Sequence, residues 1–242
     1  GTVMRANPEG VVDKRVRVLR VDPVGAPSAP GTLGGRLLPQ SDPVAVLFSY
    51  VCHATVLGHD NFRYSGDYPG AARRFVEDAY QSGAGEGTVA MFLPGCFGDV
   101  RPHLLADDGA FRGGTDHELL TLGRLLGSEV VQVAESIETR SAADVAVARR
   151  MIELPLVSAP DESKLRAVLA DEYRRNYAET MLKRLERDGW LPDSEAAEVQ
   201  VMRLGPHWLV TLPGEAMLEI GLSIERGLHE LGLARSDDGA LN

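Results

Sequence analysis

The sequence has few cysteines, no long apolar run and a deficit of basic residues. Two cysteines among 242 residues are too few for a disulfide scaffold or a four-thiolate zinc site. The longest uninterrupted apolar stretch, at residues 44–48 and extending through Ser49 and Tyr50 to Cys52, is far too short to span a bilayer, so we expect no transmembrane segment. With 25 Lys and Arg against 35 Asp and Glu, the formal net charge of -10 disfavours nucleic acid and anionic membrane surfaces as partners.

Several familiar motifs are also absent. The sequence contains no G-x-S-x-G elbow, no G-K-[ST] phosphate loop, no H-E-x-x-H and no G-x-G-x-x-G. It begins Gly1-Thr2-Val3, with no basic segment leading into an apolar one, and we expect it to be a fragment of a longer chain. These absences leave a globular domain whose chemistry must come from other motifs.

The hydrophobic pattern predicts strands that alternate with helices over residues 1–242. The fold class is therefore α/β, a layered mixed β-sheet flanked by helices in a single domain, with a hairpin at Gly205-Pro206 making the sheet mixed. Residues 44–52 and 89–93 are nearly continuous apolar runs, which is typical of strands buried on both faces. Further strands are expected at residues 14–22, 144–157, 198–204 and 207–212, helices at 67–81, 115–138, 161–189 and 213–231, and a loop or hairpin at 23–43.

Two helix starts carry local signals. Asp67 is a candidate N-cap, with Pro69 in the first turn that follows. Thr115 and Glu118 have the spacing of a capping box, in which each residue bonds the backbone of the other.

Three strands end in polar or glycine-containing motifs, which open α/β sheets gather at one edge. The motifs are Cys52-His53-Ala54-Thr55, residues 95–100, and Pro213-Gly214-Glu215. An imidazole and a carboxylate are a common pair of zinc ligands, so His53 and Glu215 are candidates. The alternative is structural: a hydrogen-bonded strand-end His53, and a Glu215 that caps a helix in its first turn.

At these motifs the sequence resembles the N-terminal catalytic domain of neutral/alkaline (non-lysosomal) ceramidases. The shared segments follow the family's order across nearly the whole chain: residues 12–22, 52–55, 64–70, 98–102 and 212–215. The resemblance implies a zinc amidase that acts on a small-molecule or lipid-like acyl-amide. It also implies an extracellular, periplasmic or cell-surface location.

The resemblance implies a zinc ion held by two histidines, a glutamate and a tyrosine. The family's second histidine ligand falls on His53, and its glutamate ligand, in a P-G-E motif, falls on Glu215. The other histidine and the tyrosine belong to segments outside this chain. Two of the four ligands are therefore expected here.

One position departs from the family pattern. Where the family has its catalytic serine, in a Gly-Asp-x-Ser-Pro motif, this sequence has Arg101. A guanidinium stays charged at neutral pH and cannot act as a nucleophile, but it can bind a carboxylate or phosphate bidentately. Cleavage of ceramide itself is therefore doubtful, whereas zinc-dependent hydrolysis needs no serine.

The remaining candidates surround this site. Asp99 and Asp67 are candidate catalytic residues, although a turn aspartate equally suits hydrogen bonds to the loop backbone. Arg101 and His103 are candidate substrate-binding residues, with a solvated loop histidine as the alternative for His103. Cys52 and Cys96 form either a disulfide or two buried thiols.

Three hypotheses follow for the function. The first is a zinc-dependent hydrolase of an amide or related acyl bond. The second is a catalytically degenerate binding or scaffold domain of the same fold, suggested by Arg101. The third is a cysteine-based hydrolase that uses Cys96 as its nucleophile.

Overall fold

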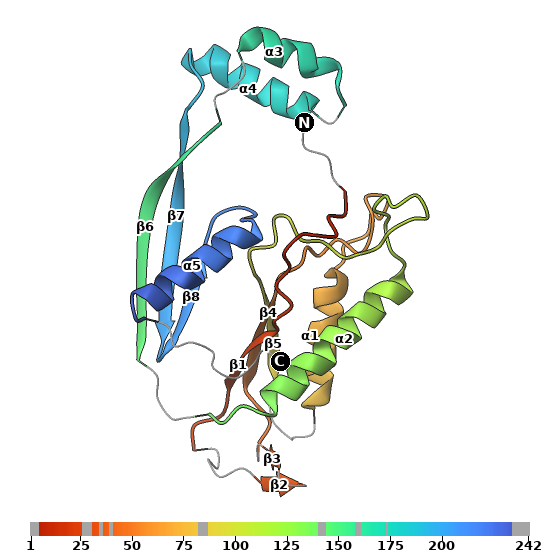
Figure 1. Ribbon diagram of the computed structural model, residues 1–242, viewed down its shortest axis with the longest axis vertical. Coiled ribbons are helices and arrows are strands. Elements are labelled where there is room, and N and C mark those ends of the chain that lie inside the picture. The colour runs from red at the N-terminus through yellow and green to blue at the C-terminus, as the bar shows by residue number, and fades with distance from the viewer. Residues whose placement is uncertain are drawn as a thin grey trace. The chain divides into compact units, whose positions relative to one another are not determined.

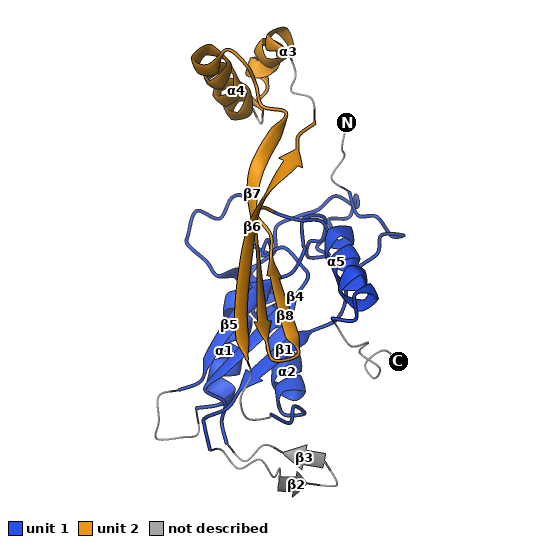
Figure 2. Ribbon diagram, turned by 90° about the vertical axis from the view of Figure 1, so that its left-hand side faces the viewer, with its two compact units in different colours: residues 1–143, 215–242 blue, residues 144–214 orange. Residues whose placement is uncertain are grey.

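The computed structural model describes residues 5–25, 31–33, 36–38, 41–81, 87–139, 144–157, 161–172 and 174–233. These residues group into two compact units (Figure 2). Unit 1 comprises Gly1–Ala143 and Glu215–Asn242, and unit 2 comprises Asp144–Gly214. The predicted α/β class is confirmed, while the division into two units was not anticipated from the hydrophobic pattern.

Unit 1 is built on a small mixed sheet with strand order β1-β4-β5. Strand β1 (Arg17–Val21) pairs antiparallel with β4 (Ala45–Tyr50), and β4 pairs parallel with β5 (Val89–Pro94). Two further short strands, β2 (Gly31–Leu33) and β3 (Arg36–Leu38), form the antiparallel hairpin that was one alternative for residues 23–43. The sheet is mixed because β1 runs against β4.

Two helices of unit 1, α1 (Asp67–Ala79) and α2 (Asp116–Ala134), lie side by side against this sheet (Figure 1). The core of this unit combines alanine and valine side chains with two leucines and three aromatic residues, Phe48, Tyr68 and Tyr80. Its fully buried members include Val46, Phe48, Val56, Val76 and Val130. This packing removes the apolar face of each helix from water, which is the main source of stability for the unit.

The two helix starts behave differently. At α2, the Thr115 hydroxyl accepts the N–H of Glu118, and the Glu118 carboxylate accepts the N–H of Thr115, so the predicted capping box is confirmed. At α1, the prediction of Asp67 as the N-cap is wrong, because the N-cap is Gly66. Asp67 is instead the first helical residue, with φ of 50°, and its carboxylate bonds other backbone groups described below.

Strand β5 is not buried on both faces as predicted. It lies at one edge of the three-stranded sheet, where Val89 and Met91 are 55% and 49% exposed and only Ala90 is fully buried. On the outer side of the strand, Arg73 donates from Nε to the Ala90 carbonyl at 2.7 Å, and Glu77 accepts the Ala90 N–H at 3.1 Å. Side chains of α1 therefore satisfy the strand's outward backbone groups at this residue.

Unit 2 contains an antiparallel sheet and a helical pair. Strands β6 (Val145–Pro155), β7 (Ser194–Leu204) and β8 (His207–Thr211) follow each other in that order across the sheet. The predicted hairpin at residues 205–206 is confirmed, but it lies in this sheet, so it does not make the sheet of unit 1 mixed. The predicted helical stretch 161–189 forms α3 (Glu162–Ala167), a short 3-10 turn and α4 (Arg175–Asp188).

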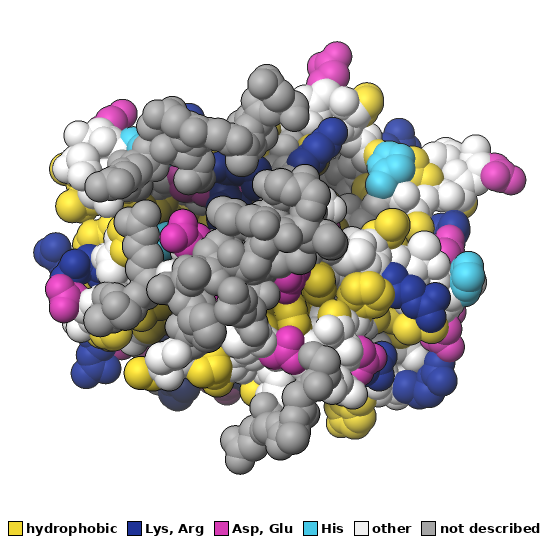
Figure 3. All heavy atoms as spheres, turned by 90° about the horizontal axis from the view of Figure 1, so that it is seen from below, with side chains coloured by type: hydrophobic (Ala, Val, Ile, Leu, Met, Phe, Trp, Pro, Cys, Tyr) yellow, Lys and Arg dark blue, Asp and Glu magenta, His cyan; other side chains and the backbone are white. Residues whose placement is uncertain are grey.

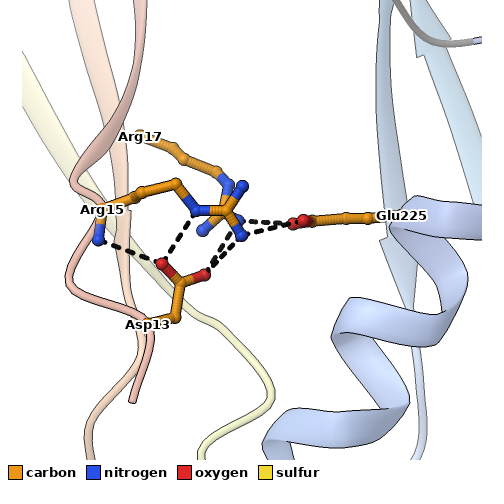
Figure 4. A network of polar contacts seen from close by, with 4 residues as sticks. All are labelled: Asp13, Arg15, Arg17 and Glu225. Atoms are coloured by element: carbon orange, nitrogen blue, oxygen red, sulfur yellow. Dashed lines mark hydrogen bonds and ion pairs between the residues drawn. The ribbon is translucent and has the colours of Figure 1, made fainter. Parts of the chain in front are cut away.

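Helix α5 (Leu218–Glu230) belongs to unit 1 and begins five residues later than predicted. A polar network joins it to the segment before β1 (Figure 4). Glu225 accepts hydrogen bonds from Arg15, at 2.8 Å, and from Arg17, and both arginines also bond the nearly buried carboxylate of Asp13. Segments more than 200 residues apart in the sequence are held together by these contacts.

The surface shows no segregation of charge on the face seen in Figure 3. Acidic and basic side chains lie interspersed there, with hydrophobic side chains exposed between them. None of the helices in the described parts of the chain has both the length and the apolarity needed to cross a membrane.

Candidate metal and substrate site

The candidate site lies within unit 1, where three loops meet after β4, after β5 and before α5. The loop after β4 carries His53, which is half-buried, and the loop before α5 carries the exposed Glu215. His53 Nε2 lies 3.2 Å from Glu215 Oε2, across 162 residues of sequence. The structure therefore brings together the two residues proposed as metal ligands.

The other ring nitrogen of His53 fixes its protonation pattern. Nδ1 lies 2.7 Å from the Phe97 carbonyl oxygen and 3.2 Å from that of Val100. Because a carbonyl oxygen only accepts hydrogen bonds, Nδ1 must carry a proton in these contacts. In a neutral imidazole, Nε2 then carries a free lone pair, and this atom faces Glu215.

An unprotonated Nε2 and a carboxylate oxygen are both acceptors, so at 3.2 Å a proton or a metal ion must lie between them. The proton can be carried by either partner, and a metal ion can take its place. Two ligands of one tetrahedral zinc ion, each bonded at about 2.0–2.1 Å, lie roughly 3.3 Å apart. The donor types and their separation therefore fit zinc, and the bond from Nδ1 to a carbonyl is the usual outer support of a zinc-bound histidine.

Close backbone packing positions Glu215. A Cβ atom at Gly98 would lie 2.2 Å from the Glu215 carbonyl oxygen, so only glycine permits this approach. The Gly98 N–H donates to the Ala216 carbonyl at 2.8 Å, and Gly214 has φ of 77°, a conformation that favours glycine. The loop after β5 thereby holds the P-G-E loop beside His53.

Contrary to the prediction, Glu215 does not lie in the first turn of a helix. Helix α5 begins at Leu218, whose N–H is accepted by Asp99 Oδ1 at 2.9 Å. Asp99 therefore bonds the backbone at the start of α5, the structural alternative for a turn aspartate. Its catalytic role remains a prediction.

Asp67 supports the loop that carries His53. Its carboxylate is buried and accepts the N–H groups of Val56 at 3.1 Å, Leu57 at 2.9 Å and Tyr68 at 2.8 Å. The Tyr68 hydroxyl donates to the Cys52 carbonyl at 2.7 Å. The first turn of α1 thus fixes residues 52–57, and the catalytic role predicted for Asp67 stays a prediction.

Arg101 and His103, the two candidate substrate-binding residues, differ in surroundings. Arg101 is half-buried, and its guanidinium carbon lies 4.4 Å from the centroid of the Phe111 ring. His103 is exposed, as the solvated alternative requires. Substrate binding by either residue remains a prediction.

Both cysteines are free thiols and half-buried, so they do not form the disulfide of the first alternative, and neither is fully buried as the second had it. Burial raises the pKa of the Cys52 thiol to about 11, and burial also raises the pKa of the Cys96 thiol. Both thiols are therefore protonated at neutral pH, which is unfavourable for a nucleophilic role of Cys96.

Four features of the site were not singled out from the sequence. The Phe97 carbonyl orients His53, the Phe97 ring stands edge-on to the imidazole with centroids 4.5 Å apart, and Phe111 stacks on Arg101. The Thr55 hydroxyl is buried without a hydrogen-bond partner in the described part of the chain. Thr55 and Phe97 each lie in one of the strand-end motifs named above, whereas Phe111 had no sequence signal.

The arrangement of strands and helices places the chain in a structural class: it has a ceramidase-like fold. It is similar to the crystal structure of neutral ceramidase from Pseudomonas aeruginosa, with a TM-score of 0.56, 16% identity, and coverage of 93% of this chain and 38% of that one. It is also similar to a ceramidase complexed with C2, with a TM-score of 0.60, 14% identity, and coverage of 95% and 42%. The chain thus spans about two fifths of the length of these neighbours.

No protein-family model and no curated protein sequence matches the chain. The likeness to ceramidases is therefore one of fold.

Proposed function

We propose that the chain is the core of a zinc-dependent hydrolase that cleaves an amide or related acyl bond in a small-molecule or lipid-like substrate. The observation that carries the proposal is the pairing of His53 Nε2 with Glu215 Oε2 at 3.2 Å, with Nδ1 bound to the Phe97 carbonyl. The ceramidase-like fold supports the same chemistry.

Each residue of the candidate site has a defined task in this proposal. His53 and Glu215 would hold the zinc ion, and a bound zinc ion supplies polarisation of the scissile carbonyl and a water of lowered pKa. The Phe97 carbonyl keeps the proton of His53 on Nδ1, so that Nε2 remains available as a ligand. Asp99 and Gly98 hold the loop of Glu215, and Arg101 would bind substrate.

The remaining zinc ligands are proposed to come from outside this chain. Among the described residues, no group of three or more His, Cys, Asp or Glu side chains is arranged to hold a metal. The second candidate function, a binding or scaffold domain of the same fold without catalysis, is suggested by Arg101 at the position of the family's serine. The two candidates differ in whether zinc binds at His53 and Glu215.

Zinc affinity tests the proposal directly. The dissociation constant for zinc is measured by equilibrium dialysis on this chain and on a polypeptide extended at both ends to the length of the structural neighbours. We expect tight zinc binding in the longer form, weakened roughly 100-fold or more by His53→Ala or Glu215→Gln. The matched controls His117→Ala and Glu219→Gln, at exposed positions, should leave the affinity unchanged.

Hydrolysis of N-acyl amides by the zinc-loaded longer form is the second measurement. Activity that depends on His53 would exclude the binding-domain alternative. Absence of stoichiometric zinc in both forms, or equal affinity in the variants and their controls, would refute the hydrolase.

A further inference from the structure

Arg101 carries a charged side chain that no described residue neutralises. Its Nε atom is buried without a hydrogen-bond partner, and no ion pair or hydrogen bond joins the guanidinium to any residue in the described ranges. The guanidinium is charged at all working pH values and has five N–H donors. A buried donor without an acceptor is costly, so such a group calls for an explanation.

Elsewhere in unit 1 a buried arginine is fully paired. The Arg20 side chain is 0% exposed, and it bonds Asp22 at 2.8 Å, Glu135 at 3.3 Å and the Ser41 carbonyl at 2.5 Å. The same fold thus supplies acceptors to an arginine whose role is structural. Arg101 differs because the described residues provide it with an aromatic ring and no acceptor.

The aromatic contact holds the guanidinium in place. Phe111 is presented by a tight loop in which Leu105 bridges Phe111 antiparallel and the Arg112 N–H donates to the Leu104 carbonyl at 3.0 Å. The guanidinium carbon lies 4.4 Å from the ring centroid, a cation–π contact that restricts where the guanidinium can lie. Arginine presents its donors in a rigid planar fork, which favours a planar, bidentate acceptor.

Arg101 lies in the loop that is bonded to His53. It directly follows Val100, whose carbonyl accepts the His53 backbone N–H at 2.8 Å and also lies 3.2 Å from His53 Nδ1. A molecule that reacts beside His53 would therefore meet the loop that carries Arg101.

We infer that Arg101 binds a carboxylate of the substrate, and that the substrate class is an amide bearing a carboxylate, such as an N-acylated amino acid. This inference rests on the proposed hydrolase function and specifies its substrate. A carboxylate supplies both the negative charge and the two coplanar acceptors that the guanidinium lacks. An uncharged alcohol would leave the cation without a counter-charge.

A matched pair of ligands tests the inference by binding. N-octanoylglycine and N-octanoylethanolamine share an acyl chain and an amide, and they differ in a terminal carboxylate or hydroxyl. Isothermal titration calorimetry on the chain should show at least about 10-fold tighter binding of N-octanoylglycine. Arg101→Gln should abolish this preference, and Arg101→Lys should keep part of it because the charge remains.

The control variant is Arg149→Gln, an equal loss of charge at an exposed arginine of unit 2, which should keep the full preference. Thermal unfolding of each variant shows that it is folded. Equal affinity of the chain for the two ligands, an unaltered preference in Arg101→Gln, or no binding of N-octanoylglycine at millimolar concentration would overturn the inference.

The inference and the proposed function fail in different ways. If N-octanoylethanolamine is hydrolysed as fast as N-octanoylglycine, and the activity depends on zinc and His53, the proposed hydrolase function stands and carboxylate recognition by Arg101 is refuted. If the protein binds no zinc but prefers N-octanoylglycine, and the preference requires Arg101, carboxylate recognition stands and the proposed hydrolase function is refuted.

Discussion

At the scale of single residues, Asp67 combines an unusual backbone conformation with a fully used carboxylate. Its φ of 50° lies in the left-handed region, which aspartate tolerates better than most residues. The carboxylate accepts three backbone N–H groups, those of Val56, Leu57 and Tyr68. Its loss would leave buried donors of the loop that carries His53 without an acceptor.

We expect Asp67→Ala to lower the free energy of unfolding by about 2–4 kcal/mol, because two or three buried hydrogen bonds lose their acceptor. Urea denaturation monitored by circular dichroism measures the change. The same change at the exposed Asp116, in the first turn of α2, should cost less than about 0.5 kcal/mol. Equal effects of the two variants would contradict the bracing role assigned to Asp67.

At the scale of elements, α1 and α2 approach closely at a glycine. A Cβ atom at Gly123 would lie 2.4 Å from Ala71 Cβ and 2.9 Å from the Tyr68 carbonyl oxygen. Both contacts are far shorter than real Cβ contacts, and both partners are held by helix α1. The two helices must therefore separate if the residue gains a side chain.

Gly123→Ala should destabilise the chain by about 1–3 kcal/mol through overpacking, in spite of the better helix propensity of alanine. Gly70→Ala in α1 is the matched control, since a Cβ atom there meets nothing within 4 Å. That variant should be neutral or stabilising by up to about 1 kcal/mol. Melting temperatures of the two variants decide the matter, and a stabilising Gly123→Ala would show that the helices are not in close contact.

The elements that could be predicted are those whose cause is local. The spacing of Thr115 and Glu118 gave the start of α2, and the apolar run that ends near Cys52 gave β4. The exposure of Val89 depends on which strand forms the sheet edge, and the start of α5 depends on Asp99, 119 residues earlier in the chain. Such long-range contacts leave no local pattern in the sequence.

In the candidate site, too, the features with a local sequence pattern could be predicted, and those that depend on long-range contacts could not. His53 and Glu215 were predicted because each follows a strand within a recognisable motif, and the structure places them 3.2 Å apart. The carbonyl of Phe97 and the ring of Phe111 were not predicted, because a backbone acceptor has no residue signature and Phe111 lies in an irregular loop. Positions of supporting groups come from the fold.

At the scale of the whole molecule, the network of Asp13, Arg15, Arg17 and Glu225 ties the segment before β1 to helix α5. Burial by itself raises the pKa of Asp13, but hydrogen bonds from Arg15 and Arg17 outweigh burial and hold the pKa well below its usual value. A depressed folded-state pKa stabilises the fold above the unfolded value of about 3.9, and this contribution is lost as the pH falls further.

Asp13→Asn should therefore lower the free energy of unfolding by about 2 kcal/mol at neutral pH, and by progressively less below about pH 4. Urea denaturation of both proteins at neutral pH and at about pH 3 measures the difference. Asp116→Asn, at an exposed position, serves as the control. A difference between the Asp13 variant and the parent that is the same at both pH values would contradict this account.

The contacts of Arg73 and Glu77 with Ala90 have a consequence for association between copies of the chain. An edge strand with free N–H and C=O groups is a template on which a strand of another molecule can pair and start an aggregate. Here those groups of Ala90 are already bonded, so a foreign strand must first displace two charged side chains of α1. Arg73 and Glu77 of helix α1 therefore disfavour the addition of a strand from another molecule at this point of β5, although both residues add little to the core.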